Sequence, residues 1–421
     1  MFKYLFYLIF LCAWLLAFPV IRRTFLTFIS LQLGSVSILF LESSFIRRLY
    51  HKFENLFRAP IKLQADNERG KIKLPHEGYT ISVETALNSR CNSDYDQNPK
   101  KFHWGMFDKT KRLSDEQIKK MIELAKIPRF TNQKAEIQFE HNILSFVVDN
   151  LGSDIRKNWL MIESGMQQQA VGLICAALGV GMVFKSLGED GTTISDTEYA
   201  TIKIKLDAMK PTYDGSFWTS SAPTGSKPWL RGNLKDPARK GKNPLVSTLE
   251  RLKTENRTGK ESTDETVGQL LWAARGRTPH LYKSRPWGMT IPTAGGRQNI
   301  SSVYLISDNQ LYRYLNWQKN RPTHSLLVVR KIEIELHKEL LETFPFSNCF
   351  IVLGKNEGFG RALWEVGYQL LNLLLQAQAL DLVYKAILLD ENQKETFRFI
   401  GIPDPVFAFF LRHKNVDQGS H

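Results

Sequence analysis

Two short segments of the chain combine an arginine with hydroxyl side chains, a pairing that suits phosphate groups. The first segment contains Arg90 and Ser93, and the second contains Arg257, Thr258 and Lys260. A guanidinium offers a planar fork of donors that matches a dianionic phosphate, and a neighbouring hydroxyl adds one more hydrogen bond. Arg257 and Thr258 supply both groups in adjacent residues, whereas Arg90 with Ser93 is a poorer version. The sequence therefore predicts two phosphate-binding segments of unequal quality.

Each arginine segment is followed by the same order of features. A helical stretch ending in alanine comes first, then a loop containing proline, then a strand, and finally a long apolar helix that opens with Glu-x-Gly. The corresponding pairs are 122–125 and 270–274, 127–133 and 291–299, 144–148 and 303–306, and 163–165 and 365–367. A repeat this long indicates a duplicated domain rather than a solenoid unit. Two similar halves can pack face to face as a dimer within one chain.

Two helical stretches, 167–178 and 368–382, are apolar on nearly every face. Such a helix is buried at a core or an interface. Membrane insertion is the rival interpretation, but three consecutive glutamines in the first stretch, and glutamine and asparagine in the second, argue against it. We expect central helices shared between two packed domains. Helical patterns dominate and a few short strands intervene, which predicts an α+β fold.

At 421 residues the chain is long enough for two domains and an anchor. A stretch rich in Gly, Pro, Ser, Trp and Lys separates the copies and is typical of a connector without regular structure. Such a loop is usually functional or covers a neighbouring surface. The expected parts are a membrane anchor and interfacial helix (1–53), a linker (54–80), the first copy (81–212), the connector (213–245), the second copy (246–413) and a tail (414–421).

The N-terminus has the composition of a membrane segment. Residues 2–20 are almost wholly apolar, and their length approaches the roughly 20 residues that span a bilayer. Residues 24–41 are apolar but more polar than the first stretch, and 45–53 are basic and aromatic, as in an interfacial helix. No convincing cleavage site follows, which favours an uncleaved anchor over a signal peptide. Whether 24–41 spans the bilayer is open; one span with an interfacial second helix leaves the globular part in the cytoplasm.

Composition excludes several other classes. The net charge is +14, but the basic residues are spread out and no nucleic-acid module is evident, so we expect no nucleic-acid partner. The four cysteines are too scattered for a zinc site or a disulfide framework. They are Cys12, Cys91, Cys175 and Cys349. No metal-ligand spacing, nucleotide-hydrolase phosphate loop or Ser-His-Asp arrangement is apparent.

The order of these motifs resembles the nitroreductase superfamily of flavin enzymes. It is most similar to the branch of azoline-forming peptide dehydrogenases. The matching motifs of the second copy are Arg257-Thr258-Gly259-Lys260, Leu270-Leu271-Trp272-Ala273-Ala274-Arg275-Gly276, Pro292-Thr293-Ala294-Gly295, Val303-Tyr304-Leu305, and Glu365-Val366-Gly367 with Asn372-Leu373. The resemblance covers most of residues 81–405 and implies two fused nitroreductase-like domains that form an intramolecular pseudo-dimer.

The resemblance also implies a cofactor, flavin mononucleotide (FMN), held where the two domains meet. The arginine element of one domain and the proline loop of the other would build each pocket, so the pairing is expected to be crossed. One pocket combines Arg257, Thr258 and Lys260 with Pro128, Thr131 and Asn132; the other combines Arg90 and Ser93 with Pro292, Thr293, Ala294 and Gly295. Lys260 would reach the pyrimidine edge of the flavin, and the small residues of the second loop let backbone approach a flat ring.

The first copy departs from the pattern of the family. Cys91 stands where serine is usual, and the first loop carries the bulky Arg129 and Phe130. The basic residues that the family places near the phosphate have no clear counterpart, and Arg412 is only a candidate. We therefore expect one competent flavin site and one degenerate site.

These observations predict a membrane-anchored FMN-dependent oxidoreductase that transfers a hydride or an electron pair. The expected partners are membrane lipid and a small aromatic, quinone or peptide substrate. The two domains of one chain would form the pseudo-dimer, so the chain itself is expected to be a monomer. The alternative is a flavin-free structural or binding subunit of a membrane complex. No catalytic residue is assigned. Simpler interpretations apply to Glu163 and Glu365 as carboxylates at helix N-termini, to His280 and His324 as histidines in polar loops, and to Tyr384-Lys385 as a pair at a helix end.

Overall fold

The computed structural model describes most of the chain between positions 81 and 414. The described residues are 81–89, 92–93, 107–108, 114–129, 136–140, 143–149, 154–178, 180–185, 198–209, 234–278, 288–292, 300–318, 321–345, 347–355 and 361–414. The expected anchor (1–53) and linker (54–80) lie outside them, and so does nearly all of the expected tail. In the described part of the chain, no helix has both the length and the apolar composition needed to cross a membrane.

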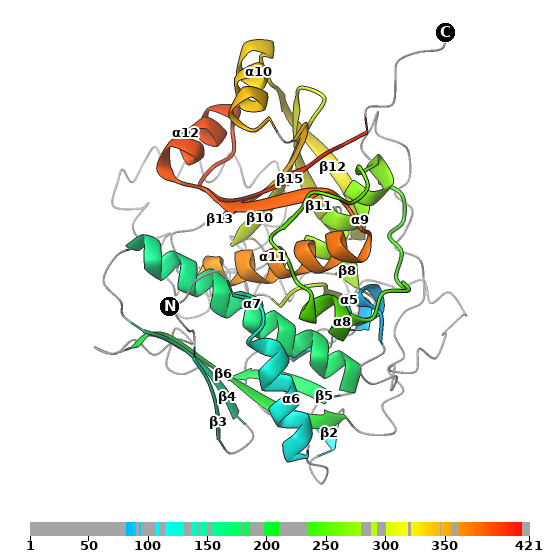
Figure 1. Ribbon diagram of the computed structural model, residues 1–421, viewed down its shortest axis with the longest axis vertical. Helices are drawn as coiled ribbons and strands as arrows, with labels where there is room; N and C mark the ends of the chain where they lie inside the picture. The colour runs from blue at the N-terminus through cyan, green and yellow to red at the C-terminus, as the bar shows by residue number, and fades with distance from the viewer. Residues whose placement is uncertain are drawn as a thin grey trace, which may run out of the picture. The chain divides into compact units, whose positions relative to one another are not determined.

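The described residues form a mixed α and β structure with two sheets (Figure 1). The first sheet has the strand order β1-β5-β6-β4-β3, and β2 also pairs with β6. Its pairings are antiparallel except that of β1 with β5. The strands are β1 (Asn92–Ser93), β2 (Phe107–Asp108), β3 (Glu136–Glu140), β4 (Ile143–Asp149), β5 (Val180–Lys185) and β6 (Glu198–Met209).

The second sheet has the order β12-β11-β10-β13-β15-β14-β7 and is antiparallel throughout. Its strands are β7 (Glu255–Asn256), β10 (Ser301–Ser307), β11 (Gln310–Gln318), β12 (Arg321–Lys331), β13 (Cys349–Lys355), β14 (Tyr384–Leu388) and β15 (Pro405–Leu411). A separate small pair joins β8 (Arg277–Thr278) to β9 (Gly288–Met289). Every residue of β15 is buried, because hydrophobic clusters cover both faces of this strand.

Some of the helices begin where the sequence supplies capping side chains. Ser114 and Gln117 form a capping box at the start of α6 (Asp115–Ala125), and Thr263 with Thr266 does the same for α9 (Asp264–Arg275). These reciprocal bonds satisfy backbone N–H groups that a helix leaves unpaired at its first turn. The remaining helices are α5 (Val83–Ser89), α7 (Asp154–Leu178), α8 (Leu245–Glu250), α10 (Ile334–Thr343), α11 (Arg361–Ala379) and α12 (Glu391–Ile400).

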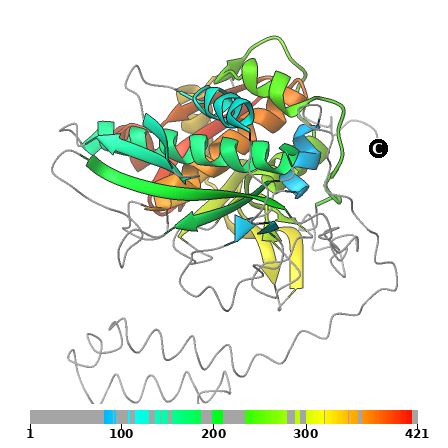
Figure 2. The ribbon, with the colours of Figure 1, turned by 90° about the horizontal axis from the view of Figure 1, so that it is seen from below.

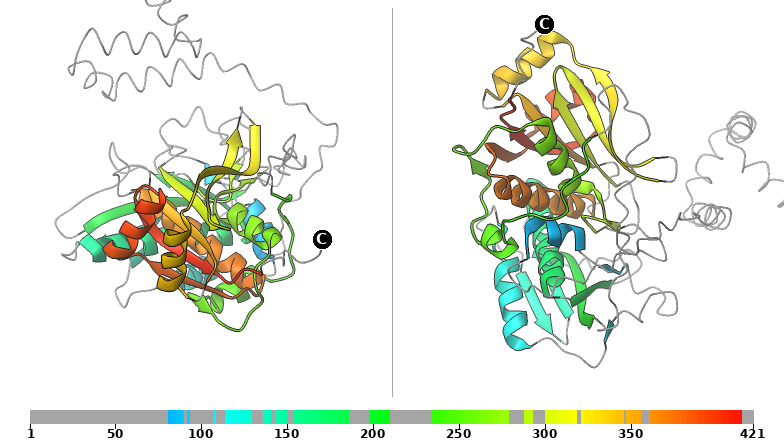
Figure 3. Two further views of the ribbon diagram at one scale, coloured as in Figure 1. Left: turned by 90° about the horizontal axis from the view of Figure 1, so that it is seen from above. Right: turned by 90° about the vertical axis from the view of Figure 1, so that its right-hand side faces the viewer.

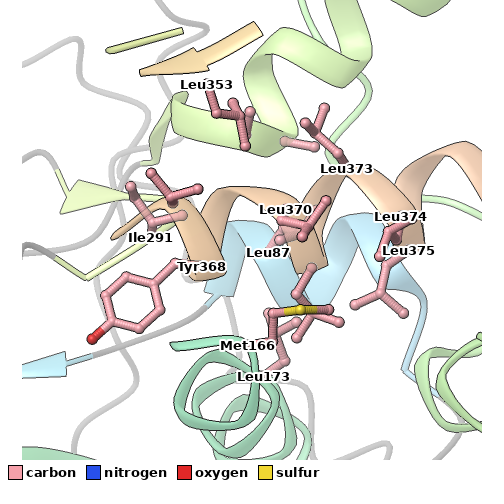
Figure 4. Packing of buried hydrophobic residues seen from close by; sticks show 14 of the residues in the cluster. Leu87, Met166, Leu173, Ile291, Leu353, Tyr368, Leu370, Leu373, Leu374 and Leu375 are labelled. Carbon is pink, nitrogen blue, oxygen red and sulfur yellow. The ribbon is translucent and has the colours of Figure 1, made fainter. Parts of the chain in front are cut away.

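The two long helices α7 and α11 pack against each other between the two sheets (Figure 1). Figure 2 shows α6 beside α7 with the first sheet, and the right-hand view of Figure 3 shows α11 between the second sheet and the first half. Leu370, Leu373 and Leu374 of α11 lie with Met166 and Leu173 of α7 in one hydrophobic core (Figure 4). This confirms the prediction that two apolar helices are buried at the centre. The second helix ends at Ala379, not at position 382.

Two glycines make this close helix crossing possible. A Cβ atom built on Gly165 would collide with the backbone oxygen of Trp364, and one built on Gly367 would lie 3.0 Å from the Cα atom of Gly165. The Gly367 position would also collide with the backbone oxygen of Ile162. Side chains at either position would hold the helices apart, because protein interiors are close-packed. The Glu-x-Gly segments of the two predicted copies therefore meet each other.

The two sheets place their strands in the same order relative to the central helix. In each, the strand that precedes the long helix, β4 or β13, lies beside the second strand that follows it, β6 or β15. Ser93 pairs in parallel with Val183, and Lys260 makes a parallel bridge to Leu382 just before β14. The sequence comparison of 144–148 with 303–306 was wrong in this respect. By position in the sheet, β4 corresponds to β13, and β10 corresponds to β3.

Replacing Gly165 or Gly367 by alanine is expected to lower the free energy of unfolding by about 1–3 kcal/mol, because the added methyl group meets backbone that cannot move aside. Gly268 in α9 is a matched control, since a Cβ there finds its nearest neighbours at 3.6 Å or beyond. Gly268→Ala should raise the free energy of unfolding by roughly 0.5–1 kcal/mol through helix propensity. Urea denaturation measures all three. Equal stability of Gly165→Ala and Gly268→Ala would contradict the close crossing.

Candidate functional site

A layer of buried polar side chains lies where α7 and α11 meet the C-terminal end of α9, and we call this region the seam. The Nε2 atom of Gln169 donates to the Thr290 oxygen at 2.9 Å and to Oδ1 of Asn372 at 2.8 Å. Asn372 in turn donates to the Ala273 oxygen at 2.8 Å. Both amide side chains are fully buried. These bonds fix the backbone that leads into Pro292, because a buried amide that lost its partners would cost free energy.

An ion pair between Arg275 and Glu365 continues the polar layer in the second half. Nη1 of Arg275 lies 2.8 Å from Oε2 of Glu365, and the Ser301 hydroxyl donates to the same carboxylate oxygen at 2.6 Å. Gln369 donates to Ser301 at 2.9 Å. Glu365 is fully buried and Arg275 nearly so. Removing either partner of such a buried pair is strongly destabilising, since it leaves a charge without compensation.

The interpretation of Glu163 and Glu365 as ordinary carboxylates at helix starts is wrong. Glu163 lies in the middle of α7, and both carboxylates are fully buried at the helix crossing. The two halves also differ there. Gln369 bonds to Ser301, whereas both polar side-chain atoms of the equivalent Gln167 lack a hydrogen-bond partner among the described residues. The second half therefore has the better satisfied polar network.

The structure places the second arginine segment at the edge of the second sheet. Arg257 follows β7 rather than lying in a helix; its side chain is 73% exposed and its Nε atom lies 2.5 Å from Oε1 of Glu255. Thr258 is exposed and contacts Oδ1 of Asn256 at 3.4 Å. The backbone N–H of Lys260 donates to the Asp381 oxygen at 2.6 Å. These residues share a turn, and no hydrogen bond or ion pair of the described residues joins them to Pro128.

Of the other nine predicted site residues, the structure describes three, and six lie outside the described part of the chain. Pro128 is buried after α6, Pro292 is buried after β9, and Ser93 belongs to β1. Arg90, Thr131, Asn132, Thr293, Ala294 and Gly295 lie outside the described residues. His280, Cys12 and Cys91 do so as well. Cys175 and Cys349 are buried, and burial raises the pKa of both thiols, so neither is poised as a nucleophile.

The C-terminal end of α5 lies near β8, which follows α9 directly. Asn88, two residues before Arg90, accepts a hydrogen bond from Nη1 of Arg239 at 2.8 Å, and the same nitrogen lies 3.5 Å from the Arg277 oxygen. The Thr290 N–H, two residues before Pro292, donates to the Gly276 oxygen at 3.0 Å. Asn88 and Thr290 therefore both lie near the C-terminal end of α9.

We call the region around Asn88, Arg239 and Arg277 the junction of the two halves. Sequence reasoning missed a cluster of buried polar and aromatic side chains beside it. His324 is not in a polar loop as expected; it lies in β12, is buried, and its Nδ1 atom is 2.8 Å from the Tyr314 hydroxyl. Burial lowers the pKa of His324 to about 3 and raises the pKa of Tyr314, so both are neutral near pH 7. The guanidinium of Arg277 stacks over Trp317 at 4.7 Å. Only the three-dimensional contact of β11, β12 and α9 assembles this cluster.

A second grouping resembles the geometry of a hydrolase triad without its chemistry. Nδ1 of His413 lies 3.1 Å from the Ser262 hydroxyl, and Nε2 lies 3.3 Å from Oδ1 of Asp264. Ser262 is fully buried and also donates to the Arg412 oxygen at 3.2 Å. A nucleophile must reach its substrate, so this grouping holds the C-terminal strand against the start of α9. Among the described residues, no group of three or more His, Cys, Asp or Glu could hold a metal ion.

Some solved structures show a limited similarity to this chain. One similar solved structure is a "putative nitroreductase" from Ralstonia eutropha JMP134, with 20% identity over 45% of this chain and 91% of that chain, at a TM-score of 0.34. Another is a "putative nitroreductase" from Anabaena variabilis ATCC 29413, with 14% identity over 65% of this chain and 69% of that chain, at a TM-score of 0.44. No family model and no curated protein matches the chain.

Both solved structures are named for the superfamily that the sequence motifs resemble. Their identities and TM-scores are low, so any functional proposal depends on the residues of this chain. The membership of a particular branch, including the azoline-forming one, is a prediction from the motifs alone.

The buried histidine should make stability depend on pH. The pKa of His324 is about 3 in the folded chain and about 6.5 when unfolded, so the unfolded state binds more protons between these values. Stability should therefore fall as pH drops from about 6.5 towards 3, by up to about 1.4 kcal/mol per pH unit. His324→Gln keeps a partner for Tyr314 but does not titrate, so its stability should change less in this window. Urea unfolding between pH 7 and 4 measures the difference; parallel curves for both proteins would contradict it.

Proposed function

We propose that the chain is a membrane-anchored, FMN-dependent oxidoreductase of nitroreductase type, built from two fused modules that pack as a dimer within one chain. The observation that carries this proposal is the meeting of the two Glu-x-Gly segments where α7 crosses α11, with Gly165 and Gly367 in contact. Equivalent positions meet when two similar modules face each other about a twofold axis. The common order of strands in the two sheets supports the same arrangement.

The segments that open the two predicted copies also contact each other. Ser82 and Pro244, just before α5 and α8, form an antiparallel bridge. Backbone hydrogen bonds run in both directions around it, from Val83 to Asn243 at 3.1 Å and from Leu245 to Ile81 at 2.7 Å. A second contact between equivalent segments supports a pseudo-dimer, because a chance packing of unrelated domains would not pair matched positions twice.

We propose the junction near Pro292 as the competent flavin site, with Arg90 and Ser93 from the first copy and Thr293, Ala294 and Gly295 from the second. Pro292 is buried, and Thr290, two residues before it, accepts hydrogen bonds from Gln169 and Asn372. A loop of small residues that starts from a fixed backbone suits a flat ring, which needs close backbone approach. Bound flavin would supply the transfer of a hydride or an electron pair. The chain would bind, orient and shield the ring.

The other pocket, with Arg257, Thr258, Lys260, Pro128, Thr131 and Asn132, is proposed as the degenerate one. Arg257 is exposed and paired with Glu255, so its guanidinium faces solvent and already has an anionic partner. The same observation favours the alternative function, a flavin-free structural or binding subunit of a membrane complex. The two functions differ in whether the purified protein retains flavin.

The localisation and the partners are further parts of the proposal. Residues 1–53 would anchor the chain to the membrane and hold the globular part at the cytoplasmic side. A substrate that reaches the proposed flavin site would be a small aromatic compound, a quinone or a peptide, since each can stack on or beside a flavin ring. We propose no nucleic-acid partner.

Full-length protein purified in mild detergent is expected to carry bound FMN, seen as absorption bands in the blue and near-ultraviolet. Arg90→Ala should weaken FMN binding by about 10- to 100-fold, the usual effect of losing a hydrogen bond to a charged group. Arg257→Ala and the exposed control Arg251→Ala should leave binding within about threefold, because neither would contact the competent pocket. A colourless protein that takes up no added FMN would remove the flavin proposal and leave the structural alternative.

Deletion of residues 1–53 is expected to move the protein from the membrane fraction to the soluble fraction, because these residues supply the apolar length that a bilayer requires. Fractionation of lysates with and without carbonate washing measures the change. As a matched control, the charge of the interfacial stretch can be removed with Arg47→Gln and Arg48→Gln, which should weaken lipid contact without releasing the chain. Full-length chain in the soluble fraction would contradict the anchor.

A further inference from the structure

One arginine of the predicted connector lies at the junction of the two halves. Arg239 belongs to residues 234–244, which run along α9 between the first and second copies. The neighbouring Ala238 is fixed to Gln269 of α9 by two hydrogen bonds, at 2.8 and 3.0 Å. Nη1 of Arg239 donates to Asn88 at 2.8 Å. The connector therefore holds this guanidinium in place beside α5 and α9.

Most donors of Arg239 have no partner among the residues that the structure describes. Its guanidinium lies over the ring of Trp272 at 5.9 Å, which supports one face of the group. Among the described residues, only Nη1 of Arg239 donates hydrogen bonds, and Nε and Nη2 donate none. A guanidinium has five N–H donors in a planar fork. An anchored guanidinium with donors that no described residue uses is pre-organised to bind an oxyanion.

The electrostatic surroundings also favour an anion. No carboxylate of the described residues forms an ion pair with Arg239; burial lowers its pKa, and Asp236 opposes this effect. The guanidinium groups of Arg239 and Arg277 both act on Tyr314. Tyr314 and His324 are neutral, so they cannot balance this charge. A mostly buried cation is costly unless an anion approaches it.

We propose that Arg239, held by Asn88 and Trp272, binds an oxyanion, a carboxylate or a phosphate group, that enters the junction of the two halves. Arg239 lies outside every motif that the chain shares with the flavin enzymes, so this assignment comes from the fold. The oxyanion belongs either to the phosphate of a bound cofactor or to a second ligand. Binding of inorganic phosphate is independent of the flavin proposal, and therefore tests the site separately.

The test uses full-length protein in detergent and isothermal titration with inorganic phosphate at low ionic strength. Arg239→Gln keeps a donor for Asn88 but removes the charge, and it should weaken phosphate binding by about 10- to 100-fold. Arg239→Lys keeps the charge without the fork and should bind with intermediate affinity. The control Lys240→Gln removes a neighbouring exposed charge and should stay within about twofold. Thermal unfolding confirms that each variant is folded.

A comparison of FMN with riboflavin identifies the source, because the two differ only by the phosphate. If Arg239→Gln weakens FMN but not riboflavin, the oxyanion is the cofactor's phosphate. If phosphate binding falls while both flavins are unaffected, or if neither flavin binds, the oxyanion belongs to a second ligand. The proposal is overturned if the wild-type protein does not bind phosphate at low millimolar concentration, or if folded Arg239→Gln binds it as tightly as Lys240→Gln.

Discussion

The close crossing of α7 and α11 is the constraint on which the rest of the structure depends. Gly165 and Gly367 remove the side chains that would keep the helices apart, so backbone of one helix touches backbone of the other. The first sheet packs on α7, the second sheet packs on α11, and the polar seam lies where these helices meet α9. Because the interior is close-packed, even one added methyl group there must displace backbone.

Polar side chains at the crossing fix the position of one helix along the other, although burying them costs more free energy than burying apolar groups. Gln169, Asn372 and Glu365 are fully buried, and each finds partners that come from distant parts of the chain. Any slip of one helix along the other would separate these partners and leave buried polar groups unpaired. Apolar contacts such as those of Leu370 and Met166 tolerate small shifts, whereas hydrogen bonds of 2.8 Å do not.

The two halves have the same order of strands but differ in their buried polar side chains, and most of the additional features lie in the second half. The second half carries the Arg275–Glu365–Ser301 network, the extra strands β11 and β12, and the buried pair of Tyr314 and His324. The first half contributes Asn88 to the junction and offers Gln167 without a hydrogen-bond partner among the described residues. The two halves therefore share a strand order but not the polar networks that surround the central helices.

The sequence by itself determined the local elements and the central pair of helices. The capping residues Ser114 and Thr263 mark helix starts, and the all-round apolar pattern of 167–178 and 368–382 predicts burial, because these signals act within a few residues. Only the tertiary structure decided which strand corresponds to β4, where Glu365 finds Arg275, and that Arg239 meets Asn88 across 151 positions of sequence. Such contacts depend on how separate elements pack, and neither residue type nor spacing along the chain records that packing.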